Sequence, residues 1–266
     1  MVRRFLAAAV AVWLLAVASA YAQSGTLIVV GGGDTGPEIV SKALAIAGGA
    51  NAIVAVLPQA SAEPDAGDES VKMWKDAGAN EALKVSFDDR AAATDTLKRA
   101  TLIWMPGGDQ NRFMKAIQGT GLDDAIRDRY AHGAAVGGTS AGAAILVRSM
   151  FTGDADLKSL TAGATVIAPG LGLWPEVLVD QHFLTRQRDN RLLSAVLDHP
   201  DLVGVGIDES TGVIVRGHAF DVIGRSSVVV MDARHAHVDK ASPGQRVSGR
   251  GISVSVLHAG QHYDLR

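Results

Sequence analysis

The sequence predicts an α/β protein with a mostly parallel central sheet, helices on both faces of that sheet, and an antiparallel extension at the C-terminal end. Short, almost entirely apolar segments of strand length alternate with helix-like segments over the first two thirds of the chain. This pattern is typical of parallel strands that are buried on both faces. After Leu202, strand-like segments follow one another with turn residues between them and little helix, as in antiparallel sheets.

The apolar segments define the expected strands, and the segments between them define the expected helices. Parallel strands are expected at 26–31, 52–57, 101–105, 134–137 and 177–179. Helices are expected at 37–47, 71–77, 111–118, 141–150 and from about 186 to 199. Antiparallel strands are expected at 203–207, 212–215, 227–231 and 252–257. Sites in parallel sheets form where loops leave the carboxyl ends of the strands, so the turns at 31–36, 107–110, 137–142 and 180–182 should lie together.

Residues 1–22 are expected to be a signal peptide. A short basic start precedes an almost entirely apolar run over 5–20, and Ala20-Tyr21-Ala22 fits the small-x-small cleavage rule with Gln23 as the first mature residue. A retained membrane anchor is the alternative, but the apolar run is short for a span and no second one follows. We therefore expect residues 23–266 to form one domain that is exported to the periplasm or the extracellular space.

The composition excludes several classes of protein. Hydrophobic residues make up 47% of the chain and aromatic residues only 5%, which indicates a core of Ala, Val, Ile and Leu. The chain has no cysteine, so it has no disulfide framework, no thiol chemistry and no lipid anchor of the lipoprotein type. The formal charge of −3 becomes −5 without the two arginines of the signal peptide, which argues against binding of nucleic acid or an anionic membrane.

The stretch GGTSAGAAIL at 137–146 contains G-x-S-x-G around Ser140, after a predicted strand and before a predicted helix. Small neighbours allow a sharp strand-to-helix turn that presents the serine hydroxyl, and the helix start offers unpaired N–H groups to a developing negative charge. The alternative is a glycine-rich helix start that only packs tightly. The residues at the other predicted turns distinguish between these two interpretations.

Two further glycine-rich turns end predicted strands. VVGGGDTGPE contains G-x-G-x-x-G as Gly31, Gly33 and Gly36. A dinucleotide site is the alternative there, but no acidic residue ends the next strand, which favours a structural turn at the rim of the active site. WMPGGDQNRF contains Gly108, whose backbone N–H could form an oxyanion hole together with that of Ala141.

A serine nucleophile needs a base and an orienting carboxylate. His182 ends the apolar strand in VLVDQHF, and the segment VGVGIDES places Asp208 and Glu209 at another strand end, where either could orient the base. The resulting order of serine, histidine and acid differs from that of α/β-hydrolases, in which the acid precedes the histidine. That order would require a late residue such as His258 and would leave DQH unexplained.

Three arginines follow the candidate base in LTRQRDNRLL. Arg186, Arg188 and Arg191 lie at the start of the predicted helix that runs to about His199. They are compatible with a solvated helix face. Their position next to His182 favours another role, because guanidinium groups bind carboxylates with two parallel hydrogen bonds. We expect this cluster to hold an acidic substrate.

Taken in order along the chain, GGDQ, GGTSAGA, DQHF followed by R-x-R-x-x-R-L, and IDE-x-T resemble the motifs of the cyanophycinases of serine peptidase family S51. The resemblance covers essentially all of residues 23–266. It implies a flavodoxin-like three-layer sandwich similar to class I glutamine amidotransferases. It also implies that Ser140 is the nucleophile, His182 the base and Glu209 the orienting acid. Pocket residues implied in the same way are Gln110, Asp180, Gln181, Arg186, Arg188 and Arg191.

The substrate implied by the resemblance is cyanophycin, a poly-aspartate backbone that carries arginine on each β-carboxyl, cut to β-Asp-Arg dipeptides by exopeptidase action. No cofactor and no metal are implied. Two alternatives stay open: an S51 peptidase for other aspartyl or β-aspartyl peptides, and a non-catalytic binding protein of the same fold. The expected signal peptide sets this chain apart from the intracellular members of the family. It favours a role in scavenging external polymer. The expected partners are the peptide substrate, with no nucleic acid and no stable membrane anchor, and a homodimer is left open.

Overall fold

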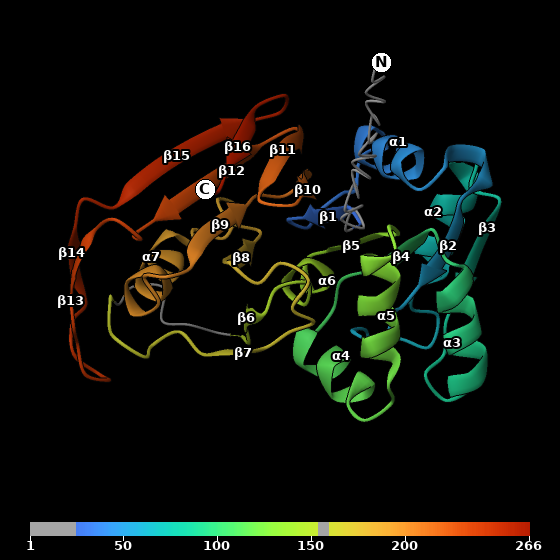
Figure 1. Cartoon of the computed structure of the whole chain (residues 1–266), viewed down its shortest axis with the longest axis horizontal. Helices are drawn as coiled ribbons and strands as arrows, with labels where there is room; N and C mark the ends of the chain where they lie inside the picture. The colour runs from blue at the N-terminus through green and yellow to red at the C-terminus, as the bar shows by residue number, and fades with distance from the viewer. Residues whose placement is uncertain (1–24, 154–159) are drawn as a thin grey trace, which may run out of the picture.

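A computed structural model of the protein describes residues 25–153 and 160–266. It has a central eight-stranded sheet with helices on both faces, and a second sheet of four strands built by the C-terminal part of the chain (Figure 1). The expected signal peptide, residues 1–22, lies outside the described residues. In the part of the chain that the structure describes, no helix is long and apolar enough to cross a membrane.

The central sheet is parallel over five strands in the order β1–β5–β4–β2–β3. These strands are β1 (Leu27–Val30), β2 (Ile53–Val56), β3 (Glu81–Lys84), β4 (Leu102–Met105) and β5 (Ala135–Thr139). Beyond β1 the sheet continues with antiparallel strands: β10 (Thr211–Arg216), β11 (Ala219–Gly224) and β16 (His262–Asp264). The predicted fold class, a mostly parallel sheet with a C-terminal antiparallel extension, is confirmed.

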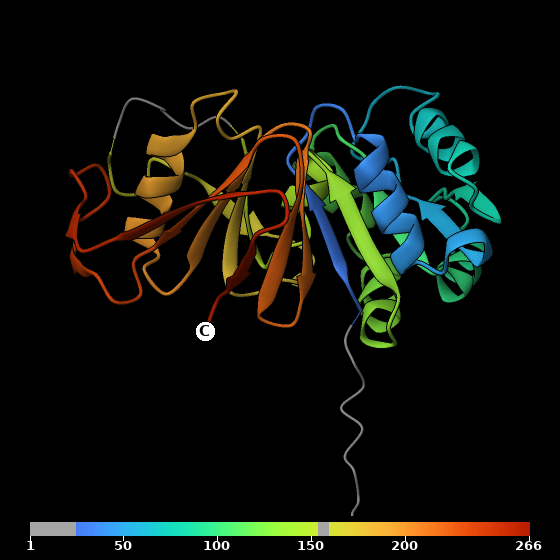
Figure 2. The same ribbon diagram turned by 90° about the horizontal axis from the view of Figure 1, so that it is seen from above.

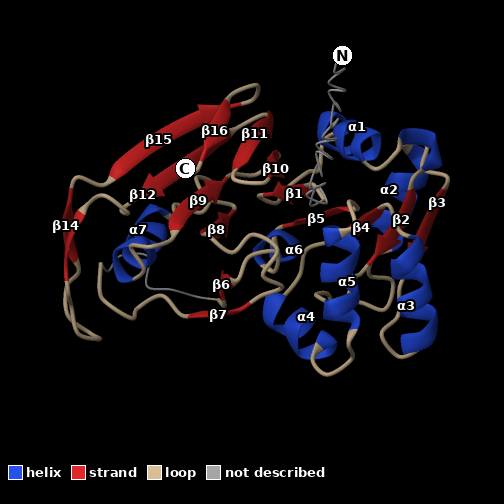
Figure 3. Ribbon diagram, viewed as in Figure 1, coloured by secondary structure: helices blue, strands red, loops and turns tan. Residues whose placement is uncertain are grey.

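Helices cover both faces of this sheet, which explains why its inner strands β1 and β4 are apolar at every position (Figures 2 and 3). Along β1, Leu27 and Val29 pack into one hydrophobic cluster, whereas Ile28 and Val30 pack into another on the opposite face. The second face is covered by α1 (Pro37–Ile46) and α2 (Asp68–Asp76). The first face is covered by α3 (Arg90–Arg99), α4 (Gln110–Ile117), α5 (Leu122–Ala131) and α6 (Ala141–Ala144).

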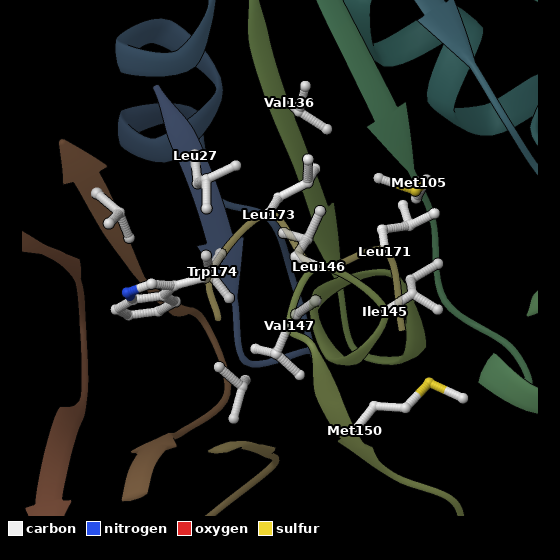
Figure 4. Packing of buried hydrophobic residues seen from close by; sticks show 14 of the residues in the cluster. Leu27, Met105, Val136, Ile145, Leu146, Val147, Met150, Leu171, Leu173 and Trp174 are labelled. Carbon is white, nitrogen blue, oxygen red and sulfur yellow. The ribbon is translucent and has the colours of Figure 1, made fainter. Parts of the chain in front are cut away.

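Helix α6 is much shorter than the helix predicted over 141–150. Residues 145–147 are completely buried, and the loop at 170–173 lies against them (Figure 4). The Leu171 amide donates to the Ile145 carbonyl at 2.7 Å, and the Leu173 amide donates to the Leu146 carbonyl at 2.8 Å. Burial on all sides and hydrogen bonds to a distant segment therefore replace the helix after its first turn, and the chain enters β6 (Ser149–Phe151), which pairs with β7 (Ile167–Pro169).

The second sheet has the order β15–β12–β9–β8. Its strands are β8 (Val177–Gln181), β9 (Val203–Ile207), β12 (Ser227–Asp232) and β15 (Ser253–His258), and α7 (Asp189–Asp198) packs on one face of it. The strand predicted at 177–179 therefore belongs to this sheet and not to the central one. The remaining elements are η1 (Gly49–Asn51) and the hairpin of β13 (His237–Asp239) with β14 (Ser248–Arg250).

Candidate active site

Ser140 occupies the sharp turn between β5 and α6. Its φ of 54° and ψ of −115° lie in a region that residues with a side chain seldom adopt. Glycines make the turn possible, because a Cβ atom at Gly142 would lie 1.8 Å from the Met105 carbonyl oxygen, and one at Gly138 would lie 2.5 Å from the Gly142 carbonyl oxygen. The Ser140 amide donates to the Val30 carbonyl at 3.0 Å. The turn is thus held against the end of β1 with the hydroxyl presented at the edge of the sheet.

His182 follows β8 and reaches Ser140 from the second sheet. Its Nε2 lies 2.8 Å from Ser140 Oγ, although 42 residues separate the two along the chain. The backbone of His182 has a φ of 51°, and its amide donates to the Gly31 carbonyl at 2.6 Å. The side chain is largely buried. His182 is therefore held in place by hydrogen bonds to its backbone amide as well as to its ring.

Glu209 completes a line of hydrogen bonds. Its Oε1 lies 2.5 Å from His182 Nδ1, and it stands in the turn that leads from β9 in the second sheet to β10 in the central sheet. A carboxylate can only accept, so this contact assigns the ring proton to Nδ1 and leaves Nε2 to accept the proton of the Ser140 hydroxyl. The geometry is that of an activated serine nucleophile.

Asp208, the other carboxylate considered from the sequence, has different partners. It accepts from the Thr185 amide at 2.9 Å and from the Ser226 hydroxyl at 2.7 Å. Burial acts to raise the pKa of Asp208, but these hydrogen bonds outweigh burial and hold the pKa below its usual value. Asp208 therefore joins the turn after His182 to the start of β12, and Glu209 alone of the two contacts the imidazole.

The electrostatic surroundings keep the imidazole neutral. Burial lowers the pKa of His182, because the imidazolium form loses solvation, and the positive charges of Arg186 and Arg188 lower it further. The hydrogen bond and negative charge of Glu209 oppose these effects without cancelling them. At neutral pH His182 is therefore unprotonated on Nε2, which is the state that a general base requires.

The turn at Gly107 and Gly108 lies directly beside the serine. A Cβ atom at Gly107 would lie 3.4 Å from Ser140 Cβ and 3.8 Å from its Oγ. Gly108 has a φ of 138°. Ala141 is the first residue of α6, where backbone N–H groups have no partner within the helix. The oxyanion hole formed by the Gly108 and Ala141 amides stays a prediction, at a position next to Ser140.

Gln110, predicted to line the substrate pocket, begins α4. Its Nε2 donates to the Phe151 carbonyl at 2.8 Å, and the neighbouring Asn111 side chain donates to the Thr152 carbonyl. Asp109 is the helix N-cap and accepts from the Asn111 amide at 2.7 Å. In this structure Gln110 anchors the last residue of β6, and Asn111 anchors the residue that follows it.

Arg191 is buried and bound inside the protein. Its Nε donates to Asp180 Oδ2 at 2.9 Å, and its Nη2 donates to Asp180 Oδ1. Its Nη1 donates to the Gly153 carbonyl at 3.0 Å. The guanidinium carbon also lies 5.0 Å from the centroid of the Phe151 ring, within the range of a cation–π contact. The donors of Arg191 are therefore used within the protein.

Asp180 and Gln181 are buried as well, with 0% and 7% of their surface exposed. Arg188 Nη1 donates to Asp180 Oδ1 at 3.3 Å, to the Gln181 carbonyl at 2.7 Å and to Gln181 Oε1 at 2.6 Å. Burial raises the pKa of Asp180, and the hydrogen bonds and charges of Arg191 and Arg188 oppose that rise. Asp180 and Arg191 thus satisfy each other's charge in the interior, and their predicted place in the lining of the substrate pocket stays a prediction.

Arg186 differs from the other two arginines. It lies before α7 in an exposed turn, and its amide donates to the His182 carbonyl at 2.9 Å. Its guanidinium forms no ion pair with any residue in the described ranges. Of the three predicted carboxylate binders, Arg186 is the one whose side chain is free to meet a substrate.

An open cavity of about 330 Å³ begins at Pro106 and Gly107, next to the serine turn. Its wall is acidic and includes Glu63, Asp65, Asp68 and Glu69. These residues belong to the acidic stretch at 62–70, in which Asp68 begins α2. Nothing in the sequence placed this stretch beside Gly107, because the proximity arises from the pairing of β2 with β4.

The glycine-rich turn after β1 packs against the histidine and the glutamate. A Cβ atom at Gly32 would lie 2.3 Å from His182 Cε1, and one at Gly33 would lie 2.9 Å from Glu209 Cβ. The space above this turn is thus filled by the site itself, which agrees with a structural turn at the rim of the active site. Across residues 25–153 and 160–266, no group of three or more His, Asp or Glu side chains is arranged to hold a metal ion.

Sequence comparison identifies curated relatives along nearly the whole chain. A cyanophycinase from Geminocystis herdmanii is 35% identical over 259 residues, which cover 92% of this chain and 95% of the relative. A cyanophycinase from Synechococcus elongatus is 37% identical over 259 residues, covering 91% and 80% of the two chains. Among solved structures, a peptidase from an acI-B1 Actinobacterium superposes with a TM-score of 0.64 at 21% identity, over 92% of this chain and 98% of that one.

The model of peptidase family S51 matches residues 27–223. This range runs from β1 into β11 and includes the serine turn, the end of β8 and the turn after β9, which together hold Ser140, His182 and Glu209. The fold, the hydrogen-bonded line of these side chains and the family match agree on one kind of chemistry, hydrolysis by a serine peptidase. The chain belongs to peptidase family S51.

Proposed function

We propose that this S51 peptidase hydrolyses cyanophycin and releases β-Asp-Arg dipeptides by exopeptidase action. The observation that carries the proposal is the line from Ser140 Oγ to His182 Nε2 at 2.8 Å and from His182 Nδ1 to Glu209 Oε1 at 2.5 Å. It occurs in a chain that aligns with cyanophycinases at 35% and 37% identity over at least 91% of its length. An intact nucleophile, base and orienting acid favour an enzyme over a binding protein of the same fold.

In the proposed mechanism, Ser140 Oγ attacks the carbonyl carbon of a backbone peptide bond while its proton passes to His182 Nε2. The negative charge on the carbonyl oxygen is held by the backbone amides of Gly108 and Ala141. The carbon–nitrogen bond then breaks, and the leaving amine takes the proton from Nε2. Water, deprotonated by His182, hydrolyses the acyl-enzyme and restores the serine. Glu209 holds the ring and stabilises the imidazolium that forms.

Charged groups of both signs surround the candidate site. They suit a polymer that itself carries negative carboxylates and positive guanidinium groups. Arg186 is exposed and unpaired among the described side chains, and its guanidinium suits an aspartate carboxylate or the free carboxyl end of the polymer. The cavity at Gly107 is acidic, which suits the cationic arginine side chains of the substrate. These two features support cleavage in the backbone with the link between aspartate and arginine kept intact.

Export is part of the proposal. The basic start, the apolar run over 5–20 and the cleavage sequence at 20–22 support removal of a signal peptide and a role in the use of external polymer. Expression of the full chain in a Gram-negative host, followed by sequencing of the mature N-terminus, tests this part. We expect Gln23 in the periplasmic or extracellular fraction, and recovery from membranes with Met1 still present would refute it.

The substrate proposal is tested by incubating the protein of residues 23–266 with insoluble cyanophycin and determining the masses of the soluble products. Ser140→Ala, prepared in parallel, is the matched control. We expect β-Asp-Arg from the wild type and no product from the variant. Free arginine as the main product would mean that a different bond is cut. Inactivity on cyanophycin with good turnover of short aspartyl dipeptides would assign the chain to another peptidase specificity, and binding without turnover of either would favour the non-catalytic alternative.

A further inference from the structure

The four residues 30–33, at and directly after the end of β1, contact all three members of the hydrogen-bonded line. The Val30 carbonyl accepts from the Ser140 amide at 3.0 Å, and the Gly31 carbonyl accepts from the His182 amide at 2.6 Å. The Gly32 carbonyl accepts from the amide of Ser210, which follows Glu209, at 2.9 Å. A single short segment thus joins residues that come from β5, from β8 and from the turn after β9.

Gly32 makes a second contact, with the imidazole itself. A Cβ atom at this position would lie 2.3 Å from Cε1, 2.5 Å from Nε2 and 2.8 Å from Nδ1 of His182. Real Cβ atoms do not approach other atoms this closely, so the backbone of Gly32 lies flat against the ring. The ring cannot give way cheaply, because its two nitrogens are hydrogen-bonded to Ser140 and Glu209.

The next glycine supports the acid. Gly33 has a φ of 66°, and a Cβ atom there would lie 2.9 Å from Glu209 Cβ and 3.2 Å from its Oε2. Both glycines therefore leave room that the side chains of His182 and Glu209 occupy. By contrast, a Cβ atom at Gly36 in the same turn would meet only the flexible end of the Glu38 side chain, at 2.9 Å.

We infer that Gly32 is a positioning residue for the base: its bare backbone supports one face of the His182 ring and sets the ring's place between Ser140 and Glu209. The contacts with His182 and Glu209 thus explain the glycines of this turn, and no bound nucleotide is needed to explain them. A methyl group at this position displaces the ring, and a displacement of about 1 Å at a catalytic group costs on the order of 10²-fold in rate.

Backbone strain must be separated from displacement of the ring, because Gly32 has a φ of 109° that disfavours any side chain. Gly48 provides the matched control. Its φ is 105°, almost the same, but no atom lies within 4 Å of the position of its Cβ. Gly48→Ala therefore places a side chain at a similarly unfavourable φ, at a position remote from the site.

The first test compares kcat and KM of Gly32→Ala and Gly48→Ala. We expect both variants to lose thermal stability, but only Gly32→Ala to lose kcat, by roughly 10²-fold, with KM changed much less. We also expect a downfield proton resonance for His182 Nδ1–H in the wild type, because this hydrogen bond is short, and it should weaken or shift in Gly32→Ala and stay unchanged in Gly48→Ala. Equal kcat and an equal resonance in the two variants would overturn the inference.

The second test does not need activity. The loss of melting temperature caused by Gly32→Ala is measured in the wild type and again in His182→Ala, where the ring is absent. We expect a smaller loss in the second background, and an equal loss would show that the added methyl group does not meet the ring. The inference rests on the proposed function, and the outcomes separate the two: an active Ser140→Ala refutes the function, whereas an inactive Ser140→Ala with a fully active Gly32→Ala refutes the positioning role alone.

Discussion

Glu209 and Asp208 are neighbours in the chain, but their carboxylates bind different groups. Glu209 Oε1 lies 2.5 Å from His182 Nδ1. Asp208 accepts from the Thr185 amide at 2.9 Å and from the Ser226 hydroxyl at 2.7 Å. The turn between β9 and β10 thus supplies one carboxylate to the imidazole and another to the loop that follows it, and the two should be separable by mutation.

Glu209→Gln should lower kcat far more than Asp208→Ala does. The amide of a glutamine cannot hold the Nδ1–H tautomer in the way that a carboxylate does, and loss of the orienting acid in serine proteases costs on the order of 10⁴-fold in kcat. Asp208→Ala should instead lower the free energy of unfolding by about 1–3 kcal/mol, because it removes the charged acceptor of two part-buried hydrogen bonds. Steady-state kinetics and urea unfolding of both variants check this. A larger loss of kcat in Asp208→Ala than in Glu209→Gln would show that Asp208, and not Glu209, orients the imidazole of His182.

The pH dependence of kcat/KM should show the lowered pKa of His182. Because burial and the charge of Arg186 disfavour the imidazolium form, the acid limb should have an apparent pKa below the ordinary histidine value of about 6.5. Arg186→Gln removes a positive charge, which raises the pKa of His182 and moves the acid limb to higher pH. Arg186→Lys keeps the charge and serves as the control. A limb that stays in place or moves to lower pH in Arg186→Gln would contradict this account of the electrostatics.

Asp180→Ala should destabilise the protein strongly. The change leaves the buried guanidinium of Arg191 without its carboxylate, and breaking a buried ion pair in this way costs about 3–5 kcal/mol. Arg186→Ala, in an exposed turn, is the control and should change the free energy of unfolding by no more than about 0.5 kcal/mol. Denaturant unfolding of the two variants measures the difference. If Asp180→Ala kept wild-type stability and only raised KM, Asp180 would be a substrate ligand after all.

The fold was predictable where burial leaves a clear mark on the sequence. Strands such as β1 and β4 are apolar at every position because helices cover both of their faces. Helix α3 and strand β3 were not predicted, because neither has this apolar pattern. Helix α3 buries only Ala93 and Leu97, and β3 buries only Ala82, so their sequences are largely polar.

The candidate site was predictable at positions where a motif fixes the backbone. Ser140 follows from the glycines on both sides of it, and His182 follows from its place at the end of an apolar strand. The direction of the charged side chains was not predictable in this way. A run of arginines looks the same in sequence whether it faces solvent or a buried carboxylate, and only the packing of α7 on the second sheet brings Arg191 to Asp180.

Covalent labelling tests the central claim, that Ser140 is a nucleophile activated by His182, most directly. The mature protein is treated with a fluorophosphonate and digested with trypsin, and the modified peptide is identified by mass. The peptide of residues 130–148 contains Ser140 as its single serine, so a label on it can be assigned. We expect stoichiometric labelling of this peptide in the wild type, and none in Ser140→Ala or His182→Ala. Labelling of the peptide of residues 192–216, which contains Ser210, or equal labelling in His182→Ala, would contradict the account.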